Sequence, residues 1–178
     1  MKYDDVDHYS IWLETENPNC PHRKAIDEIS RTTGTPAFTP HITLIGDIRR
    51  QGVDVIQKKI DELAGYTCAF DVHFGYFFIG PNWLNVILIF ARQNSTLTNL
   101  HLRAERVFEK RSLLYLPHMS LLYGKVSRVV KKRVIKKVKE DGILKHSFTV
   151  NRISLWHCRN GVANWKRITS VELRPTPK

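Results

Sequence analysis

Apolar residues recur along this chain with two different periods, which together predict alternating strands and helices. Runs rich in β-branched and aromatic residues predict strands at 9–16, 67–79, 84–90, 148–158 and 165–173. Apolar residues at steps of three and four predict helices at 21–33, 53–65, 97–108 and 127–141. Turn residues at 80–82 and 160–161 predict two hairpins. The pattern therefore indicates an α+β fold.

One short pattern of polar and apolar positions occurs twice. Residues 40–46 read PHITLIG and residues 117–124 read PHMSLLYG. Each copy lies in a predicted strand, with a helix before it and a helix and a hairpin after it. We interpret this order as a diverged internal duplication that gives two α+β lobes within one domain over residues 1–178. No linker rich in Gly, Ser or Pro separates the halves, so we expect interleaved lobes in one rigid body.

The alternation of side chains along a strand orients the residues of both copies. His41 and Thr43 share one face, and the residue between them points to the apolar side. His118 and Ser120 have the same relation. Tyr123 lies five residues after His118, so a regular strand would turn it away unless a β-bulge intervenes. Tyr123 is therefore expected either in the site or as a core aromatic residue.

Composition places the chain among globular proteins. It has 178 residues, of which 42% are hydrophobic and 10% aromatic. The first residues do not form a secretory signal, and no apolar run reaches transmembrane length. The three Cys are widely spaced and are interpreted as reduced thiols, with one disulfide and one leftover thiol as the alternative. We expect an intracellular monomer, cytoplasmic or nuclear, with no membrane partner.

Positive charge favours an anionic partner. The chain holds 28 Lys and Arg against 17 Asp and Glu, a net charge of +11, which attracts phosphates above all. The predicted helix 127–141 has a stripe of Val130, Val134 and Val138. We expect its basic residues to form a solvated face rather than a track for RNA. These residues are Lys131, Lys132, Arg133, Lys136, Lys137 and Lys139.

A single His-x-hydroxyl triplet carries little information about function. A third copy, His8-Tyr9-Ser10, has no preceding Pro and lies close to the first residue, so we discount it. The remaining His residues are expected at the surface or in structural roles: His22, His73, His101, His146 and His157.

Two His and two hydroxyl groups suit a displacement at phosphorus. Neutral imidazole can take a proton from water, and imidazolium can return one to a leaving oxygen. Thr43 and Ser120 can donate hydrogen bonds to non-bridging phosphoryl oxygens. The sequence contains no H-E-x-x-H, no clustered carboxylates and no Gly-rich phosphate loop, so we expect neither a metal nor another cofactor.

Three segments carry a family resemblance. Tyr9-Ser10-Ile11-Trp12, Phe38-Thr39-Pro40-His41 and residues 117–123, taken with the order of the motifs, resemble the 2H phosphoesterase superfamily and its plant and yeast cyclic phosphodiesterase branch. The similarity runs from Tyr9 to about Glu172. It implies a bilobal fold of two pseudo-symmetric lobes, with antiparallel sheets lining a central cleft and helices outside. It also implies catalysis without a metal.

The resemblance also assigns residues to roles. His41 and His118 are expected to be the general acid and base, and Thr43 and Ser120 are expected to hold the phosphate. We expect His118 to activate water and His41 to protonate the leaving oxygen, although the pseudo-symmetry makes these two roles interchangeable.

The branch opens nucleoside 2',3'-cyclic phosphates to 2'-phosphates, and ADP-ribose 1'',2''-cyclic phosphate, a by-product of tRNA splicing, to ADP-ribose 1''-phosphate. A small phosphorylated nucleotide is thus the expected partner, with Trp12 and Tyr123 at positions that resemble the branch's base-stacking groups. Two alternatives stay open. One is an enzyme acting on RNA ends or 2'-5' linkages, including a 2'-5' RNA ligase-like activity, and the other is a non-catalytic nucleotide-binding module.

Overall fold

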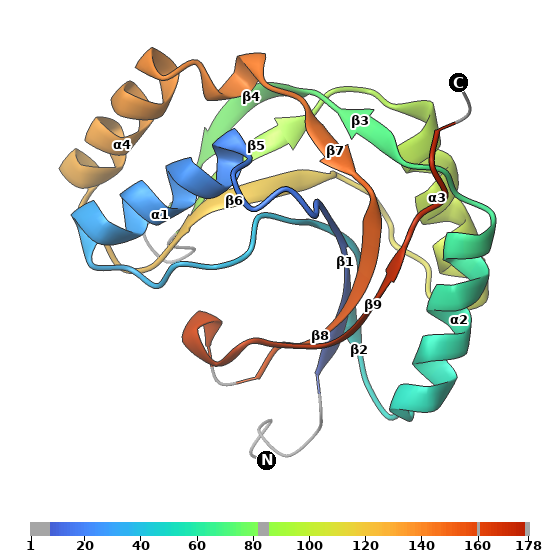
Figure 1. Ribbon diagram of the computed structural model, residues 1–178. Helices are drawn as coiled ribbons and strands as arrows, with labels where there is room; N and C mark the ends of the chain where they lie inside the picture. Colours follow the sequence, from blue (N-terminus) through green and yellow to red (C-terminus); the bar gives the residue numbers. More distant parts are fainter. Residues whose placement is uncertain (1–7, 82–85, 160, 177–178) are drawn as a thin grey trace.

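Helices form where the apolar period predicts them. The structure, a computed structural model, describes residues 8–81, 86–159 and 161–176 (Figure 1). Helix α1 has Pro21 at its first turn and ends at Gly34, whose φ of 69° is left-handed and suits a residue without a Cβ. The helices are α1 (Pro21–Thr33), α2 (Val53–Gly65), α3 (Ser95–Val107) and α4 (Arg128–Glu140), with 3-10 turns η1 (Ile143–Lys145) and η2 (Val162–Asn164).

The strands of the described residues form antiparallel sheets, which confirms the α+β class. A four-stranded sheet has the order β2-β1-β8-β9, a three-stranded sheet has the order β4-β5-β6, and β3 pairs with β7. Figure 1 shows the two larger sheets as separate lobes. The strands are β1 (Tyr9–Glu14), β2 (Ile42–Ile48), β3 (Phe70–Val72), β4 (Phe74–Ile79), β5 (Val86–Ala91), β6 (His118–Tyr123), β7 (Phe148–Val150), β8 (Arg152–His157) and β9 (Lys166–Glu172).

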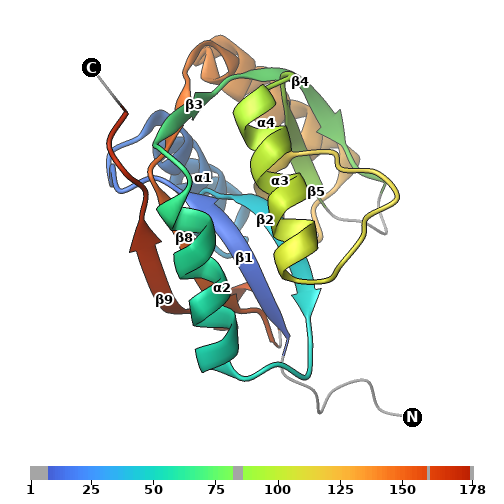
Figure 2. The ribbon, with the colours of Figure 1, turned by 90° about the vertical axis from the view of Figure 1, so that its right-hand side faces the viewer.

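The two lobes exchange helices. Helix α1 precedes the first motif but packs on β6, which carries the second motif, whereas α3 precedes the second motif and packs on β2. Helix α2 covers β8 and β9, next to α3, as Figure 2 shows. Each half of the chain thus contributes elements to both lobes.

The order of strands in the sheets corrects which strands of the two predicted repeats are equivalent. Strand β5 lies between β4 and β6, just as β1 lies between β8 and β2. The equivalent of β5 is therefore β1. Matching the two predicted hairpins with each other would instead have made β9 the equivalent of β5. The predicted strands 67–79 and 148–158 are each divided in two, because β3 and β7 leave their neighbours and pair with each other. Residue 82 of the predicted turn at 80–82 and residue 160 of the predicted turn at 160–161 lie outside the described residues.

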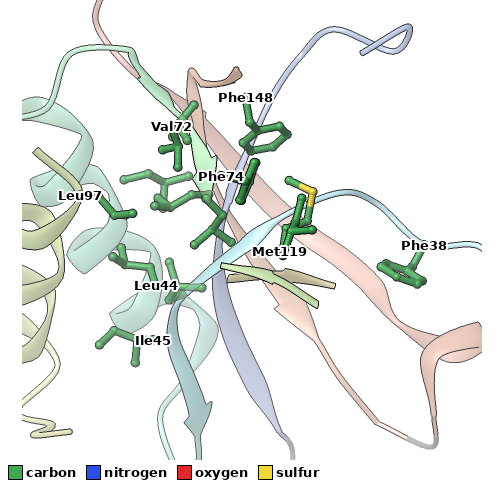
Figure 3. Packing of buried hydrophobic residues seen from close by; sticks show 14 of the residues in the cluster. Phe38, Leu44, Ile45, Val72, Phe74, Leu97, Met119 and Phe148 are labelled. Carbon is green, nitrogen blue, oxygen red and sulfur yellow. The ribbon is translucent and has the colours of Figure 1, made fainter. Parts of the chain in front are cut away.

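A continuous apolar core joins the lobes. Buried side chains of β1, β2, β5 and β6 belong to one cluster, which also includes Val72 and Phe148 of the β3–β7 pair. Figure 3 shows Val72, Phe74 and Phe148 close together, with Leu44 and Ile45 on the side of the helices. Because the core is shared, the two motif strands are fixed relative to each other.

The basic helix α4 differs from its prediction at one residue. Lys131 is 1% exposed, and its ammonium group donates a hydrogen bond to the carbonyl oxygen of Gly80 at 3.2 Å. It is therefore a buried structural cation and does not belong to the solvated face, whereas the other five basic residues are exposed. The buried carbonyl oxygen explains the position, since an ammonium group is costly to bury without an acceptor.

The Cys residues and the lengths of the helices bear on two further predictions. Cys20, Cys68 and Cys158 are all free thiols, which leaves no disulfide between them. Among the described helices, none combines the length and apolar character needed to cross a membrane.

Candidate active site

The fold brings the two motifs together. Strands β2 and β6 contact each other across the lobes, with His41 just before β2 and His118 at the start of β6. The two imidazoles are close enough that charge on His118 lowers the pKa of His41. The predicted pair of His residues therefore shares one site.

A β-bulge follows the hydroxyl residue of the first motif. Thr43 lies opposite Trp12 and Ile45 lies opposite Ile11, which leaves Leu44 as an extra residue without a partner on β1. The bulge resets the alternation of side chains. This explains how Leu44 and Ile45 are both buried although they are neighbours on one strand.

The second motif has its bulge at the equivalent position. Ser120 lies opposite Leu88 and Leu122 lies opposite Ile87, so Leu121 is the extra residue. The two copies thus agree in backbone irregularity as well as in sequence, which supports the interpretation of an internal duplication.

The bulge at Leu121 decides the position of Tyr123. Because alternation restarts after the extra residue, Tyr123 returns to the face of Ser120. Burial raises the pKa of Tyr123, and the Ser120 side chain opposes the rise. Tyr123 therefore lies on the side of the predicted site. The next residue, Gly124, has a φ of +151°, and a Cβ there would lie 2.6 Å from Thr35, so the chain approaches too closely for a larger residue.

Backbone carbonyl groups of β2, from Thr43 to Asp47, accept hydrogen bonds from side chains of the second half. None of these donors belongs to a sequence motif, and His101, predicted only as surface or structural, is buried and stacks on Tyr115 at 3.6 Å. The bonds run from Tyr115 Oη to Thr43 O (3.2 Å), His101 Nδ1 to Leu44 O (3.0 Å) and Lys110 Nζ to Gly46 O (2.7 Å) and Asp47 O (2.6 Å).

The two site imidazoles bond the backbone through the same nitrogen. His41 Nδ1 lies 2.6 Å from the carbonyl oxygen of Thr39, and His118 Nδ1 lies 2.8 Å from that of Leu116. A carbonyl oxygen can only accept, so Nδ1 carries the hydrogen in each ring. Among the described residues no hydrogen bond involves either Nε2, which leaves this nitrogen for proton transfer, as an acid–base pair requires.

The surroundings keep His41 neutral. It is 4% exposed and stacks on the Trp12 indole with ring centres 3.5 Å apart and an angle of 6°. Burial lowers the pKa of His41 to about 3, and His118 adds to this, while the bond to Thr39 opposes it. An indole favours a cation by about 0.5–2 kcal/mol, less than the several kcal/mol per ion that desolvation costs.

Both faces of the Trp12 indole are covered. His41 lies on one face, and Trp156 stacks on the other with ring centres 4.3 Å apart. Trp156 is itself held by Glu14, a buried carboxylate that accepts from its Nε1 at 2.6 Å and from Ser154 Oγ at 2.7 Å. Trp12 was predicted to stack on a base, but neither face of its indole is free. The contacts of Trp12 instead orient the imidazole of His41.

Trp165 is a site residue that no motif indicated. It lies just after η2 and is half-buried. Its ring centre is 6.1 Å from that of His41 and 5.4 Å from that of Tyr123, so it spans both motifs. The only sequence signal is a large aromatic residue at the start of the predicted strand 165–173, which could not be separated from a core position.

A cavity of about 470 Å³ opens beside the two motifs. It is bounded by Thr43 and His118, with Phe90 in its wall and Lys110 and Arg111 adding positive charge. A cavity of about 650 Å³ elsewhere contains none of the predicted site residues. Within the described ranges, no three His, Cys, Asp or Glu side chains are grouped as a metal site would require.

The chain is similar to known proteins over nearly its whole length. A model of the 2'-5' RNA ligase superfamily matches residues 18–161. A protein of Arabidopsis thaliana named cyclic phosphodiesterase is 24% identical over 185 residues, which cover 95% of this chain and 97% of that protein.

Solved structures share the two-lobed fold. Escherichia coli LigT complexed with 3'-AMP superposes with a TM-score of 0.60 at 14% identity, covering 94% of this chain and 98% of LigT. The protein TT0787 of Thermus thermophilus gives a TM-score of 0.61 at 12% identity, with coverage of 94% and 98%. At this identity the likeness concerns the fold.

Proposed function

This chain belongs to the 2'-5' RNA ligase superfamily, of the 2H phosphoesterase type, and from the geometry of its paired motifs we propose that it is a metal-independent cyclic phosphodiesterase. Its substrates in this proposal are nucleoside 2',3'-cyclic phosphates, opened to 2'-phosphates, or ADP-ribose 1'',2''-cyclic phosphate, opened to ADP-ribose 1''-phosphate. The observation that carries the proposal is the meeting of His41 and His118 with both Nε2 atoms free. The similarity to a plant cyclic phosphodiesterase supports it.

The reaction needs one proton removed and one proton supplied. A water oxygen attacks phosphorus and loses a proton to the base, while the bond from phosphorus to one ribose oxygen breaks and that oxygen takes a proton from the acid. The neutral state of His41 favours this residue as the base. His118 is half-exposed and lines the cavity, so in this proposal it takes the role of the acid. This assignment reverses the one expected from sequence.

The two hydroxyl groups complete the site. Thr43 lines the cavity beside His118, and Ser120 is buried next to Tyr123. Each hydroxyl can donate to a non-bridging oxygen as negative charge develops. The proton transfers and the charge stabilisation can therefore come from the protein's own side chains.

Entry of the phosphate requires a movement around His41. The imidazole is almost fully buried, whereas its Nε2 has to reach the attacking water. Of the rings around it, Trp165 is half-buried and lies in a connection between strands, while Trp12 is packed on both faces. We expect displacement of Trp165 to open the site.

The test is a substrate panel in excess chelator. Nucleoside 2',3'-cyclic phosphates and ADP-ribose cyclic phosphate are incubated with the protein, and phosphorus NMR identifies the monoester formed. We expect 2'-phosphates, or ADP-ribose 1''-phosphate, and no product from a His41→Gln/His118→Gln protein. Loss of all activity with chelator would overturn the metal-free mechanism. Binding without turnover across the panel would indicate a nucleotide-binding module instead.

A further inference from the structure

An aromatic row crosses the sheet of the second lobe next to His118. Phe90 on β5 lies opposite His118 on β6 and opposite Tyr76 on β4. Residues directly opposite in an antiparallel pair point to the same face. The ring centres of Phe90 and His118 are 5.8 Å apart, and those of Tyr76 and Phe90 are 5.1 Å apart in a stacked arrangement. Phe78 meets the edge of Phe90 at 6.0 Å.

Packing does not account for the outer part of this row. Tyr76 is 59% exposed and Phe78 is 39% exposed, on a strand at the edge of its sheet. The opposite face of the same sheet holds the core residues Phe74, Ile89 and Met119. The row therefore offers free ring surface, which Trp12 lacks because both of its faces are covered.

The row is continuous with the active site. Phe90 and His118 both line the 470 Å³ cavity, to which Lys110 and Arg111 add positive charge. Tyr76 lies two strands from His118, which corresponds to about 10 Å. Exposed rings on a sheet are a general means of stacking successive bases of single-stranded RNA.

From this arrangement we propose that Tyr76 and Phe78 form a stacking platform for the bases that precede a terminal 2',3'-cyclic phosphate, so that the substrate is an RNA end rather than a mononucleotide. The proposal rests on the proposed cyclic phosphodiesterase function. It also agrees with His118 as the acid. The acid protonates the leaving ribose oxygen. In this proposal the rest of the RNA chain extends from the ribose on that same side, toward the platform.

The experiment compares a mononucleotide and a trinucleotide that both end in a 2',3'-cyclic phosphate. We expect the unmodified protein to prefer the trinucleotide. In the Tyr76→Ala/Phe78→Ala variant, kcat/KM for the trinucleotide should fall roughly 10- to 100-fold more than for the mononucleotide, because each stacked base contributes a factor of that order. The loss should appear mainly in KM, and Tyr76→Trp should retain the preference.

Tyr66→Ala is the matched control, since Tyr66 is 66% exposed and lines the separate 650 Å³ cavity. The Tyr66→Ala variant should leave kcat/KM unchanged for both the trinucleotide and the mononucleotide. If the double variant does not fold, Tyr76→Leu removes the ring but keeps apolar bulk and should still reduce the preference. An equal loss on both substrates, or no loss, would overturn the platform. So would self-association through this face, seen as a doubled mass in light scattering that Tyr76→Ala abolishes.

A binding measurement separates this proposal from the proposed function. Fluorescence anisotropy of a labelled trinucleotide ending in a 2'-phosphate needs no turnover, and is done in a His41→Gln background with and without the platform residues. If no cyclic phosphate is hydrolysed but the platform variant weakens this binding roughly 10-fold or more, the platform stands and the catalytic proposal fails. If hydrolysis occurs and the variant binds equally well, the platform fails alone.

Discussion

The imidazole of His41 is enclosed, whereas the equivalent imidazole of His118 borders a cavity that residues of both motifs line. The first imidazole lies between Trp12 and Trp165, and the second contacts Phe90 and borders a space of about 470 Å³. The backbone is nevertheless alike, since a bulge follows the hydroxyl residue in both copies. The difference therefore arises from side chains contributed by neighbouring strands and connections.

This comparison shows how a duplicated motif can supply two different chemical groups. Equal backbone geometry gives both imidazoles a bonded Nδ1 and a free Nε2. Unequal enclosure then distinguishes the two rings, because burial disfavours the charged form of His41 and keeps it neutral, as a base must be. An acid and a base that work at one pH require different environments of this kind.

The largest expected effect tests the division of roles directly. His41→Gln and His118→Gln should each lower kcat/KM for a nucleoside 2',3'-cyclic phosphate by about 10²–10⁴-fold, the usual contribution of general acid or base catalysis. An activated diester such as bis(4-nitrophenyl) phosphate needs no acid, because its leaving group is stable as an anion. With this substrate His118→Gln should recover most of its loss and His41→Gln should not.

The reverse pattern of recovery would restore His118 as the base, as first expected from the sequence. Equal recovery would mean that the two environments do not divide the roles. Circular dichroism of both variants supplies the control, since the two Gln residues replace rings in shared backbone geometry and should leave the fold unchanged.

The sequence predicted the helices and strands because those depend on local patterns. Helix α1 occupies the predicted residues, and the structure places His41 and His118 near each other, while their roles stay predictions. A β-bulge was named only as the condition for Tyr123 to face the site, since the position of an extra residue depends on cross-strand register and not on composition. Lys131 and Trp165 were misjudged or missed for the same reason: their partners come from distant segments. Burial of His41 likewise depends on rings that fold over it.

The next effect concerns stability and uses the same two variants. The unfolded chain binds a proton at His41 below about pH 6.5, whereas the folded protein binds it only near pH 3. The free energy of unfolding therefore decreases as the pH falls below about 6.5. His41 alone lowers it by about 2 kcal/mol at pH 5. Urea unfolding at pH 7.5, 6 and 5 should show that His41→Gln removes this part of the loss.

His118→Gln is the comparison for this measurement. It places the same side chain at the other imidazole of the site, so it controls for the loss of a ring there. His22 contributes separately, because burial lowers its pKa to about 4 and, among the described residues, neither of its ring nitrogens has a hydrogen-bond partner. His22→Gln should remove its own share, and the two shares should add. An unchanged slope in His41→Gln would contradict the enclosed environment of that residue.

The smallest effect separates the two bulges. In the first copy, the Tyr115 hydroxyl donates to the Thr43 carbonyl oxygen beside the bulge, whereas in the second copy the Tyr123 ring itself returns to the face of Ser120 after the bulge. Tyr115→Phe removes one hydrogen bond, worth about 0.5–1.5 kcal/mol net, so kcat should fall roughly 2- to 10-fold. Because the Thr43 backbone moves but no substrate contact is lost, KM should stay close to its original value. Tyr123→Phe alters a site hydroxyl, and its effect should extend to KM. If Tyr115→Phe lowers the unfolding temperature while kcat is unchanged, Tyr115 stabilises the bulge without positioning Thr43, and the two copies differ in stability rather than in catalytic support.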